Sequence, residues 1–402
     1  IDCKENKTFL QATKCLGRVT LKDDKSSFSR RAFIKSSAAL AASAYACPFV
    51  ANVLSPSNAK AFPRDISFEH EAKWYEKTAE GVRCLLCPNA CVRGDGQRSK
   101  CHAREPRDGK LYTLVYGLPC VIMLDLVAKC PIYHVDMPEK VFSIATAGCN
   151  LGCDYCQNWQ FSQRGPEDTK NFRLTPKQVV AKALEKSCPG IAFFYTEPTV
   201  YFEYMWDIAS LAKEKGLKTI MVTAGYINEA PLRELAPLID LFTVGLKGFN
   251  SDYYRQTIHG EIKPVLKTLY TLKKLDKWFE VVNLILPGLN DSPKDMRRMS
   301  KWIKKWLGAD TPLHFTRFRP QYKLRQLPLT PVKTLERARE IALEEELNFV
   351  YIGNLPGHEG NHTYCPSCKT TLVSRLGFEV VEKKIEGGRC LNCSYQLPGM
   401  WQ

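Results

Sequence analysis

Short apolar runs alternate with amphipathic stretches between about residues 140 and 355. The apolar runs are rich in β-branched and aromatic residues, a pattern typical of buried parallel strands. We predict strands at Phe142–Ala145, Ile191–Phe194, Thr219–Thr223, Leu241–Val244, Val281–Leu284, Leu313–Arg317 and Phe349–Ile352. We predict helices between them at Lys177–Lys186, Tyr201–Lys215, Ile262–Lys274, Lys294–Trp306 and Val332–Glu345. Prolines that follow Thr175 and Ser292 mark two helix starts.

This order of strands and helices predicts an α/β fold with a parallel sheet, closed or partly closed into a barrel. A doubly wound open sheet fits the same spacing, and the pattern alone barely separates the two. We assign residues 136–355 to this domain. Residues 62–135 form an N-terminal module with four cysteines, and residues 356–402 form a separate C-terminal tail.

Residues 1–61 resemble an export signal. Ser29-Arg30-Arg31 begins a twin-arginine motif, an Ala-rich apolar stretch runs from Ala38 to Leu54, and Ala59-Lys60-Ala61 has the form of a cleavage site. An uncleaved basic amphipathic helix is the alternative. We expect an exported, periplasmic protein whose mature chain starts near Phe62, and a cytoplasmic one if the signal interpretation fails.

Composition narrows the class of protein. The chain has 402 residues, of which 45% are hydrophobic and 25% charged, so an intrinsically disordered protein is excluded. The net charge of +15 suits an anionic partner, but basic residues form no long block, and we expect no nucleic-acid binding. We also expect no membrane span in the mature chain.

The chain contains 17 cysteines, and most of them cluster at short spacings, which indicates metal binding rather than disulfides. Cys149, Cys153 and Cys156 follow a predicted strand directly, with Tyr155 before the last cysteine. Three thiolates on one loop can hold three irons of a [4Fe–4S] cluster and leave the fourth iron open to a small ligand. A zinc site completed by a distant His is the alternative.

Two further groups each hold four cysteines. Cys84, Cys87, Cys91 and Cys101 suit either zinc or an auxiliary iron–sulfur cluster. His102 is a candidate substitute ligand, but we favour a surface position for it. Cys365 and Cys368 pair with Cys390 and Cys393 as two C-x2-C knuckles around a predicted hairpin. That arrangement is typical of a zinc ribbon or a rubredoxin-like iron site.

The cysteine loop resembles that of the radical-SAM superfamily. The wider chain, from about Trp74 to Trp401, resembles the radical-SAM enzymes of the AmmeMemoRadiSam system, relatives of pyruvate formate-lyase activating enzymes. The matching segments, in chain order, are Cys84-Leu85-Leu86-Cys87-Pro88, Leu114-Val115-Tyr116-Gly117, Pro131-Ile132-Tyr133-His134, Cys156-Gln157-Asn158-Trp159, Tyr195-Thr196-Glu197-Pro198-Thr199, Leu246-Lys247-Gly248-Phe249, Leu286-Pro287-Gly288-Leu289-Asn290-Asp291 and Pro356-Gly357-His358-Glu359-Gly360.

The resemblance implies a partial (β/α)6 barrel of the TIM type with the cluster at the carboxyl end of its first strand. It also implies reductive cleavage of S-adenosylmethionine to a 5′-deoxyadenosyl radical, which abstracts hydrogen from a substrate. Tyr155 and Glu197 match cofactor-binding positions, Glu197 the one that contacts the amino group of S-adenosylmethionine; a helix-capping role is the alternative for Glu197. Two positions depart from the family, since Ala224 stands where Asn is frequent and Gly245 where Asp is frequent.

We therefore predict an anaerobic radical-SAM enzyme that takes electrons from a ferredoxin or flavodoxin. Its substrate is unknown and is either a protein, through its peptide backbone, or a small molecule. The alternatives from other classes are a non-catalytic iron–sulfur electron carrier and a zinc-ribbon nucleic-acid binder. A carrier has no need for a ligand site at Glu197, and the interleaved basic and aromatic residues of a nucleic-acid surface are not evident.

Overall fold

The computed structural model describes residues 70–137 and 140–401. The export signal expected in residues 1–61 lies outside these described residues, so its assignment stays a prediction. Within the described ranges, no helix combines the length and the apolar character needed to cross a bilayer.

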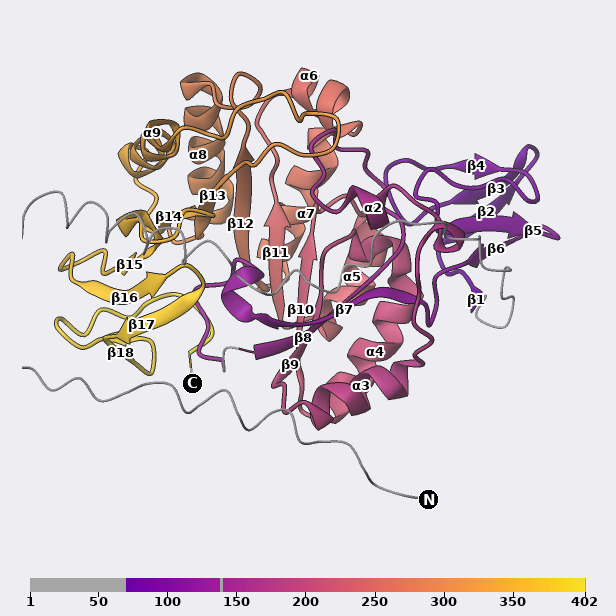
Figure 1. The fold of residues 1–402 in the computed structure, drawn as a ribbon, viewed down its shortest axis with the longest axis horizontal. Helices are drawn as coiled ribbons and strands as arrows, with labels where there is room; N and C mark the ends of the chain where they lie inside the picture. The colour runs from indigo at the N-terminus through magenta and orange to yellow at the C-terminus, as the bar shows by residue number, and fades with distance from the viewer. Residues whose placement is uncertain (1–69, 138–139, 402) are drawn as a thin grey trace, which may run out of the picture. The chain divides into compact units, whose positions relative to one another are not determined.

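An eight-stranded sheet organises the chain, in the order β14-β13-β12-β11-β10-β9-β8-β7 (Figure 1). Strands β8 to β14 are parallel to one another, and β7 is antiparallel to β8. The strands are β7 Pro119–Leu126, β8 Lys140–Thr146, β9 Gly190–Phe193, β10 Lys218–Thr223, β11 Leu241–Gly245, β12 Trp278–Ile285, β13 Leu313–Arg317 and β14 Val350–Gly353. All seven predicted strands are confirmed.

The strand order decides between the two sheet types that the pattern left open. Each strand from β8 to β14 pairs with the next one along the chain, whereas a doubly wound sheet reverses its order at a switch point. The sequential order excludes a doubly wound sheet and agrees with the predicted partial barrel, and β14 and β7 are the unpaired edges of the sheet among the described strands. β7 lies in the segment that we assigned to the N-terminal module, yet it extends the large sheet.

Helices connect the parallel strands, as predicted. They are α2 Trp159–Ser162, α3 Pro176–Glu185, α4 Phe202–Glu214, α5 Glu229–Leu235, α6 Ser251–Tyr253, α7 Ile262–Lys274, α8 Pro293–Leu307 and α9 Val332–Glu344, with a π-helix at Tyr254–Ile258. The predicted starts are confirmed, since Thr175 accepts a hydrogen bond from the Gln178 N–H and Ser292 accepts one from the Asp295 N–H.

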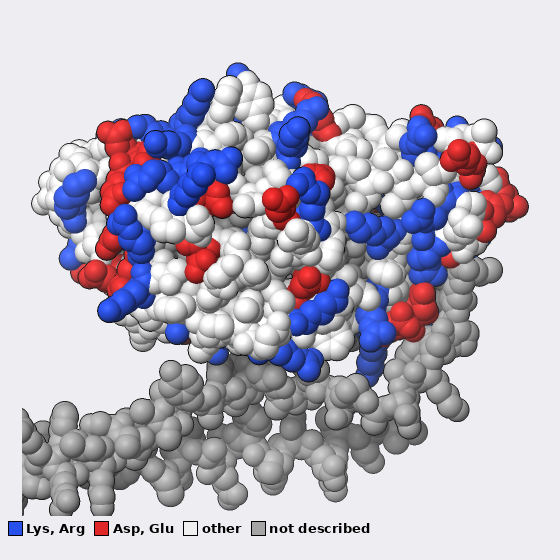
Figure 2. Space-filling model, turned by 90° about the horizontal axis from the view of Figure 1, so that it is seen from above, with Lys and Arg blue, Asp and Glu red and all other residues white. Residues whose placement is uncertain are grey.

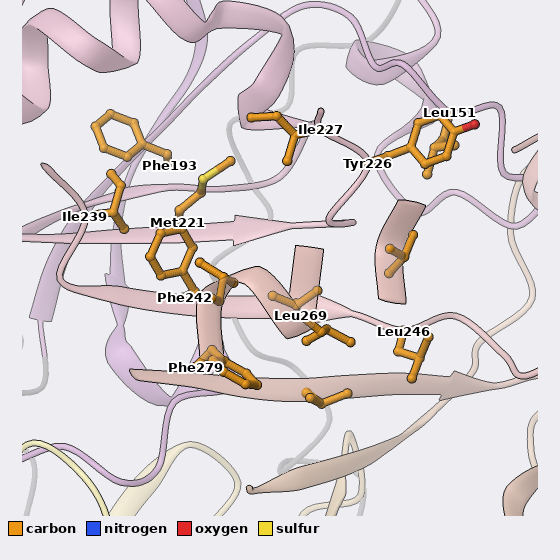
Figure 3. Close-up of a cluster of buried hydrophobic side chains, with 14 of the residues drawn as sticks. Leu151, Phe193, Met221, Tyr226, Ile227, Ile239, Phe242, Leu246, Leu269 and Phe279 are labelled. Carbon is orange, nitrogen blue, oxygen red and sulfur yellow. The ribbon is translucent and has the colours of Figure 1, made fainter. Parts of the chain in front are cut away.

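One hydrophobic core fills the space between the sheet and its helices. Phe193, Met221, Phe242 and Phe279, from four successive strands, meet Leu269 of α7 (Figure 3). The same core continues past the strand ends through Leu151, Tyr226 and Leu246. The loops that follow the strands are therefore held by the barrel core rather than by solvent-exposed contacts.

Small antiparallel sheets flank the large one. The N-terminal module contains β2 Tyr75–Thr78, β3 Gly81–Cys84 and β4 Val92–Arg93, and a second sheet of β1 His70–Glu71, β5 Arg104–Arg107 and β6 Lys110–Thr113. The tail contains β15 Thr363–Tyr364, β16 Thr371–Leu376 and β17 Glu379–Lys383, with β18 Ile385–Glu386 and β19 Arg389–Cys390. The predicted hairpin of the tail is confirmed.

The tail is tied to the barrel by a buried cation. The Arg375 guanidinium stacks 3.9 Å from the centre of the Tyr133 ring and donates to the Thr363 hydroxyl at 2.9 Å. Tyr133 in turn donates its backbone N–H to Glu280 of β12. On the face shown in Figure 2, basic side chains are interspersed with acidic ones, in agreement with surface pairs such as Arg297 with Glu344.

Candidate active site at the carboxyl end of the sheet

Cys149, Cys153 and Cys156 lie on the loop that follows β8. The loop is fixed at its middle, where Gly152 N–H donates to the Ile258 carbonyl at 3.1 Å and Asp154 N–H donates to the Thr257 carbonyl at 3.0 Å. Cys153 is buried, and Cys149 and Cys156 are half-buried. The structure thus brings the three predicted ligands together on one loop, anchored to the π-helix that follows β11.

Lys247 is a site residue that the sequence analysis quoted without assigning a role. It follows β11, and its Nζ lies 6.0 Å from the centre of the Tyr155 ring. Burial opposes the charge on Lys247, but the thiolates of Cys153, Cys149 and Cys156 together raise the pKa of its ammonium group. Tyr155 lies between Cys153 and Cys156 on the loop, so the Lys247 cation lies near the cysteine loop. Its position just past the end of a parallel strand was the available signal.

The donor set fits an iron–sulfur cluster. Burial raises the pKa of Cys153 to about 11 and that of Cys149 well above its usual value, so free thiols there would stay protonated at neutral pH. Metal binding deprotonates such thiols. The Lys247 ammonium then offsets part of the negative charge that three thiolates carry.

Glu197 follows β9 and is 2% exposed. One carboxylate oxygen accepts from the Thr199 and Thr223 hydroxyls, at 2.7 and 2.6 Å, and the other accepts from the Ala224 N–H at 2.8 Å. Glu197 also accepts from the Thr199 N–H as a helix cap. The capping role is thus observed, and it fixes the loop after β10 as well. Contact with the amino group of a cofactor stays a prediction.

Tyr155 is 4% exposed and packs in the main core. The remaining cysteines in the described part of the chain, Cys120, Cys130 and Cys188, are buried, and none of them forms a disulfide. Their burial is typical of small core cysteines.

The N-terminal cysteines contact the active-site loop, which the sequence did not indicate. Asn89, between Cys87 and Cys91, donates its side-chain amide to the Asn150 carbonyl at 2.7 Å. Gly148 has φ +98°, and a Cβ there would overlap the carbonyl oxygen of Cys101. The two cysteine-bearing segments are therefore in van der Waals contact.

The tail cysteines form a compact tetrad. Cys365 and Cys393 have sulfurs 3.6 Å apart, Cys368 and Cys390 have sulfurs 3.7 Å apart, and all four sulfurs lie within 4.8 Å of one another. A tetrahedral ion with metal–sulfur bonds of about 2.3 Å separates its sulfurs by about 3.8 Å. The spacing is that of a site for one metal ion.

Comparison with known proteins agrees with this geometry. Residues 143–303 match the family model described as the radical SAM superfamily. An uncharacterised protein of Methanocaldococcus jannaschii, MJ0808, is 42% identical over 330 residues, which cover 81% of this chain and 98% of that protein. The pyruvate formate-lyase-activating enzyme of Clostridium pasteurianum is 28% identical over 181 residues, or 42% of this chain and 72% of that enzyme.

The chain belongs to the radical SAM superfamily. A solved domain of a pyruvate formate-lyase-activating enzyme from Bacteroides vulgatus has a TM-score of 0.37 at 14% identity, over 41% of this chain and 99% of that domain, a likeness too distant to bear on function. As a member of the superfamily, the protein is an enzyme that cleaves S-adenosylmethionine to a radical, and its cofactors are a [4Fe–4S] cluster and S-adenosylmethionine.

The two positions that we expect to depart from the family, Ala224 and Gly245, lie beside Glu197 and Lys247. Ala224 donates its N–H to Glu197, a bond that any residue there could make. A Cβ at Gly245 would lie 3.7 Å from Lys247 Nζ. An Asp at that position would face the Lys247 ammonium, so Gly245 leaves this radical-SAM enzyme with a more positive rim.

Proposed function

We propose that Cys149, Cys153 and Cys156 are the ligands of the catalytic [4Fe–4S] cluster in a partial barrel. The observation that carries the proposal is the meeting of three cysteines and the Lys247 ammonium at the carboxyl end of β8 and β11. When bound there, the cluster and S-adenosylmethionine supply one-electron cleavage of the cofactor to a 5′-deoxyadenosyl radical.

The chain's own residues bind and orient S-adenosylmethionine, and they exclude water from the site. Lys247 offers an ammonium to the carboxylate of the cofactor, a charge-assisted contact. Glu197 fixes the loops after β9 and β10 and offers negative charge to the cofactor's ammonium. The barrel core around Leu151 and Leu246 closes the floor of the site to water.

A polypeptide is the substrate class that the relatives favour, because several of them are named as activators of an enzyme, pyruvate formate-lyase. Rim residues Ala224 and Gly245 differ from the wider family, so we do not carry over that particular partner. A ferredoxin or flavodoxin is the electron donor that we propose.

The test is anaerobic incubation of the reconstituted protein with S-adenosylmethionine and dithionite. We expect 5′-deoxyadenosine and methionine, and no product from Cys149→Ala, Cys153→Ala or Cys156→Ala. Cys188→Ala is the matched control, because Cys188 is a buried cysteine whose thiol donates to the Lys186 carbonyl, away from the loop. Product formation by any of the three loop variants would refute the assignment.

We also propose export by the twin-arginine route. Arg30-Arg31, the Ala-rich stretch and Ala59-Lys60-Ala61 support it. The test is cell fractionation with N-terminal sequencing, in comparison with Arg30→Lys and Arg31→Lys together. A native chain that stays in the cytoplasm with residues 1–61 attached refutes export.

A further inference from the structure

Arg104 is a buried cation with N–H donors that lack a hydrogen-bond acceptor among the described residues. It opens β5, its side chain is 1% exposed, and its Nη2 donates to Glu203 at 2.6 Å. Its Nε and Nη1 are buried and have no hydrogen-bond partner among the described residues. A buried donor without an acceptor is unfavourable, so these two N–H groups indicate an acceptor that binds beside them.

The groups beside Arg104 are thiols. Burial opposes the charge on Arg104, but Glu203 and the thiolates of Cys84 and Cys101 raise the pKa of its guanidinium. Arg104 acts on both cysteines in return, lowering the pKa of each against the effect of burial. The spare donors therefore lie in the field of the N-terminal cysteine group.

The N-terminal cysteines lie close to one another, since the Cys84 N–H donates to the Cys91 carbonyl at 3.0 Å and Cys84 packs with Cys101 in the main core. Burial raises the pKa of Cys87 to about 12, and the neighbouring Cys84 and Cys101 raise it further. Cys91 acts in the same way on Cys84 and Cys101. Cys84, Cys87 and Cys101 are buried and Cys91 is half-buried, and Cys101 lies against Gly148 of the active-site loop.

Sulfur spacing separates the possible metals. Among the described residues, the tail tetrad is the group whose ligand atoms all lie within 4.8 Å of one another, and the N-terminal thiols do not form such a group. A single zinc ion needs the tight spacing. A [4Fe–4S] cluster binds each thiolate to a different iron, so its thiolates lie farther apart, and its inorganic sulfides accept hydrogen bonds.

We propose that Cys84, Cys87, Cys91 and Cys101 hold an auxiliary iron–sulfur cluster and that Arg104 donates hydrogen bonds to its sulfurs. Arg104 is then a positioning residue that raises the reduction potential, because a nearby cation stabilises the more negative reduced cluster. The proposed radical chemistry assigns no role to these four cysteines or to Arg104, so this site goes beyond it.

The test uses a chain in which Cys149, Cys153 and Cys156 are all replaced by Ala, purified anaerobically. We expect iron and acid-labile sulfide for one cluster, and an electron paramagnetic resonance signal after reduction with dithionite. Adding Cys84→Ala and Cys101→Ala should abolish both. Absence of acid-labile sulfide from the triple variant, or sulfide that survives the second pair of substitutions, would overturn the proposal. The background lacks the catalytic ligands, so the result does not depend on the proposed function.

Arg104 is tested by potentiometry in the same background. Arg104→Gln combined with Glu203→Gln keeps a neutral buried pair. We expect the equilibrium constant for reduction of the cluster to fall about tenfold, which lowers the reduction potential by about 59 mV for one electron. Glu203→Gln alone is the control, and we expect it not to lower the potential, because Arg104 keeps its charge. Arg104→Lys serves if the double variant does not fold, since it keeps the charge and loses the forked donors. A potential equal to that of the background chain in both Arg104 variants would refute the role.

Discussion

The two four-cysteine groups share a ligand count and a C-x2-C element, yet the fold treats them differently. In the tail, two knuckles face each other, and their sulfurs approach to 3.6 and 3.7 Å. In the N-terminal module, the cysteines lie farther apart beside an under-bonded guanidinium and against the active-site loop. Spacing and surroundings, rather than the number of thiols, therefore indicate whether each site takes a single metal ion or a cluster.

The largest expected effect separates the two sites by metal. Cys365→Ser with Cys390→Ser should remove one metal ion per chain, with zinc our expectation, and should leave iron content and 5′-deoxyadenosine production unchanged. The tail should lose its structure, because structural zinc sites supply about 10–16 kcal/mol of folding free energy in small peptides.

The measurement is elemental analysis together with limited proteolysis of the tail. Exposure of the native chain to air is a second check, because zinc survives oxygen and iron–sulfur clusters do not. Unchanged metal content in the double variant would contradict the ribbon assignment, and loss of iron rather than zinc from that variant would assign iron to the tail.

A smaller effect is expected at Glu197, which belongs to neither four-cysteine group. Glu197→Ala should weaken binding of S-adenosylmethionine by about 10- to 150-fold, because a charge-assisted contact contributes about 1.5–3 kcal/mol. The iron and zinc contents should not change. Isothermal titration under anaerobic conditions measures the affinity.

The control for Glu197 is Thr223→Val, which removes one donor to the carboxylate but keeps its charge. If this variant weakens binding as much as Glu197→Ala, Glu197 acts only by holding the loop after β10. Equal affinity of Glu197→Ala and the native chain would show that the residue is structural alone.

The smallest expected effect tests the contact between the N-terminal site and the active-site loop. Gly148→Ala places a methyl group against the Cys101 carbonyl at a positive φ, which strains the backbone by about 1–3 kcal/mol. We expect lower thermal stability and faster loss of iron, while the tail metal stays. Gly216→Ala is the control, because Gly216 also has a positive φ, but a Cβ there meets nothing within 4 Å. Equal effects of the two substitutions would contradict the importance of the contact.

Local sequence patterns predicted the alternating strands and helices of the large parallel sheet. Strands such as Ile191–Phe194 and helices such as Ile262–Lys274 appear in the structure nearly where hydrophobic periodicity placed them. The three loop cysteines and the two tail knuckles were also readable, because their ligands lie close together along the chain. Periodicity and short-range spacing carry such information, since they concern neighbours in sequence.

Only the tertiary structure decided what distant segments do together. The strand order decides three of these contacts. It pairs β7 with β8, it brings Lys247 near the cysteine loop, and it lets Glu197 accept a hydrogen bond from Ala224 in the loop after β10. The ion pair of Arg104 with Glu203 joins residues 99 positions apart, and it leaves two donors beside Cys84 and Cys101. Such contacts arise where packed elements meet in space, and no local pattern in the chain records which elements meet.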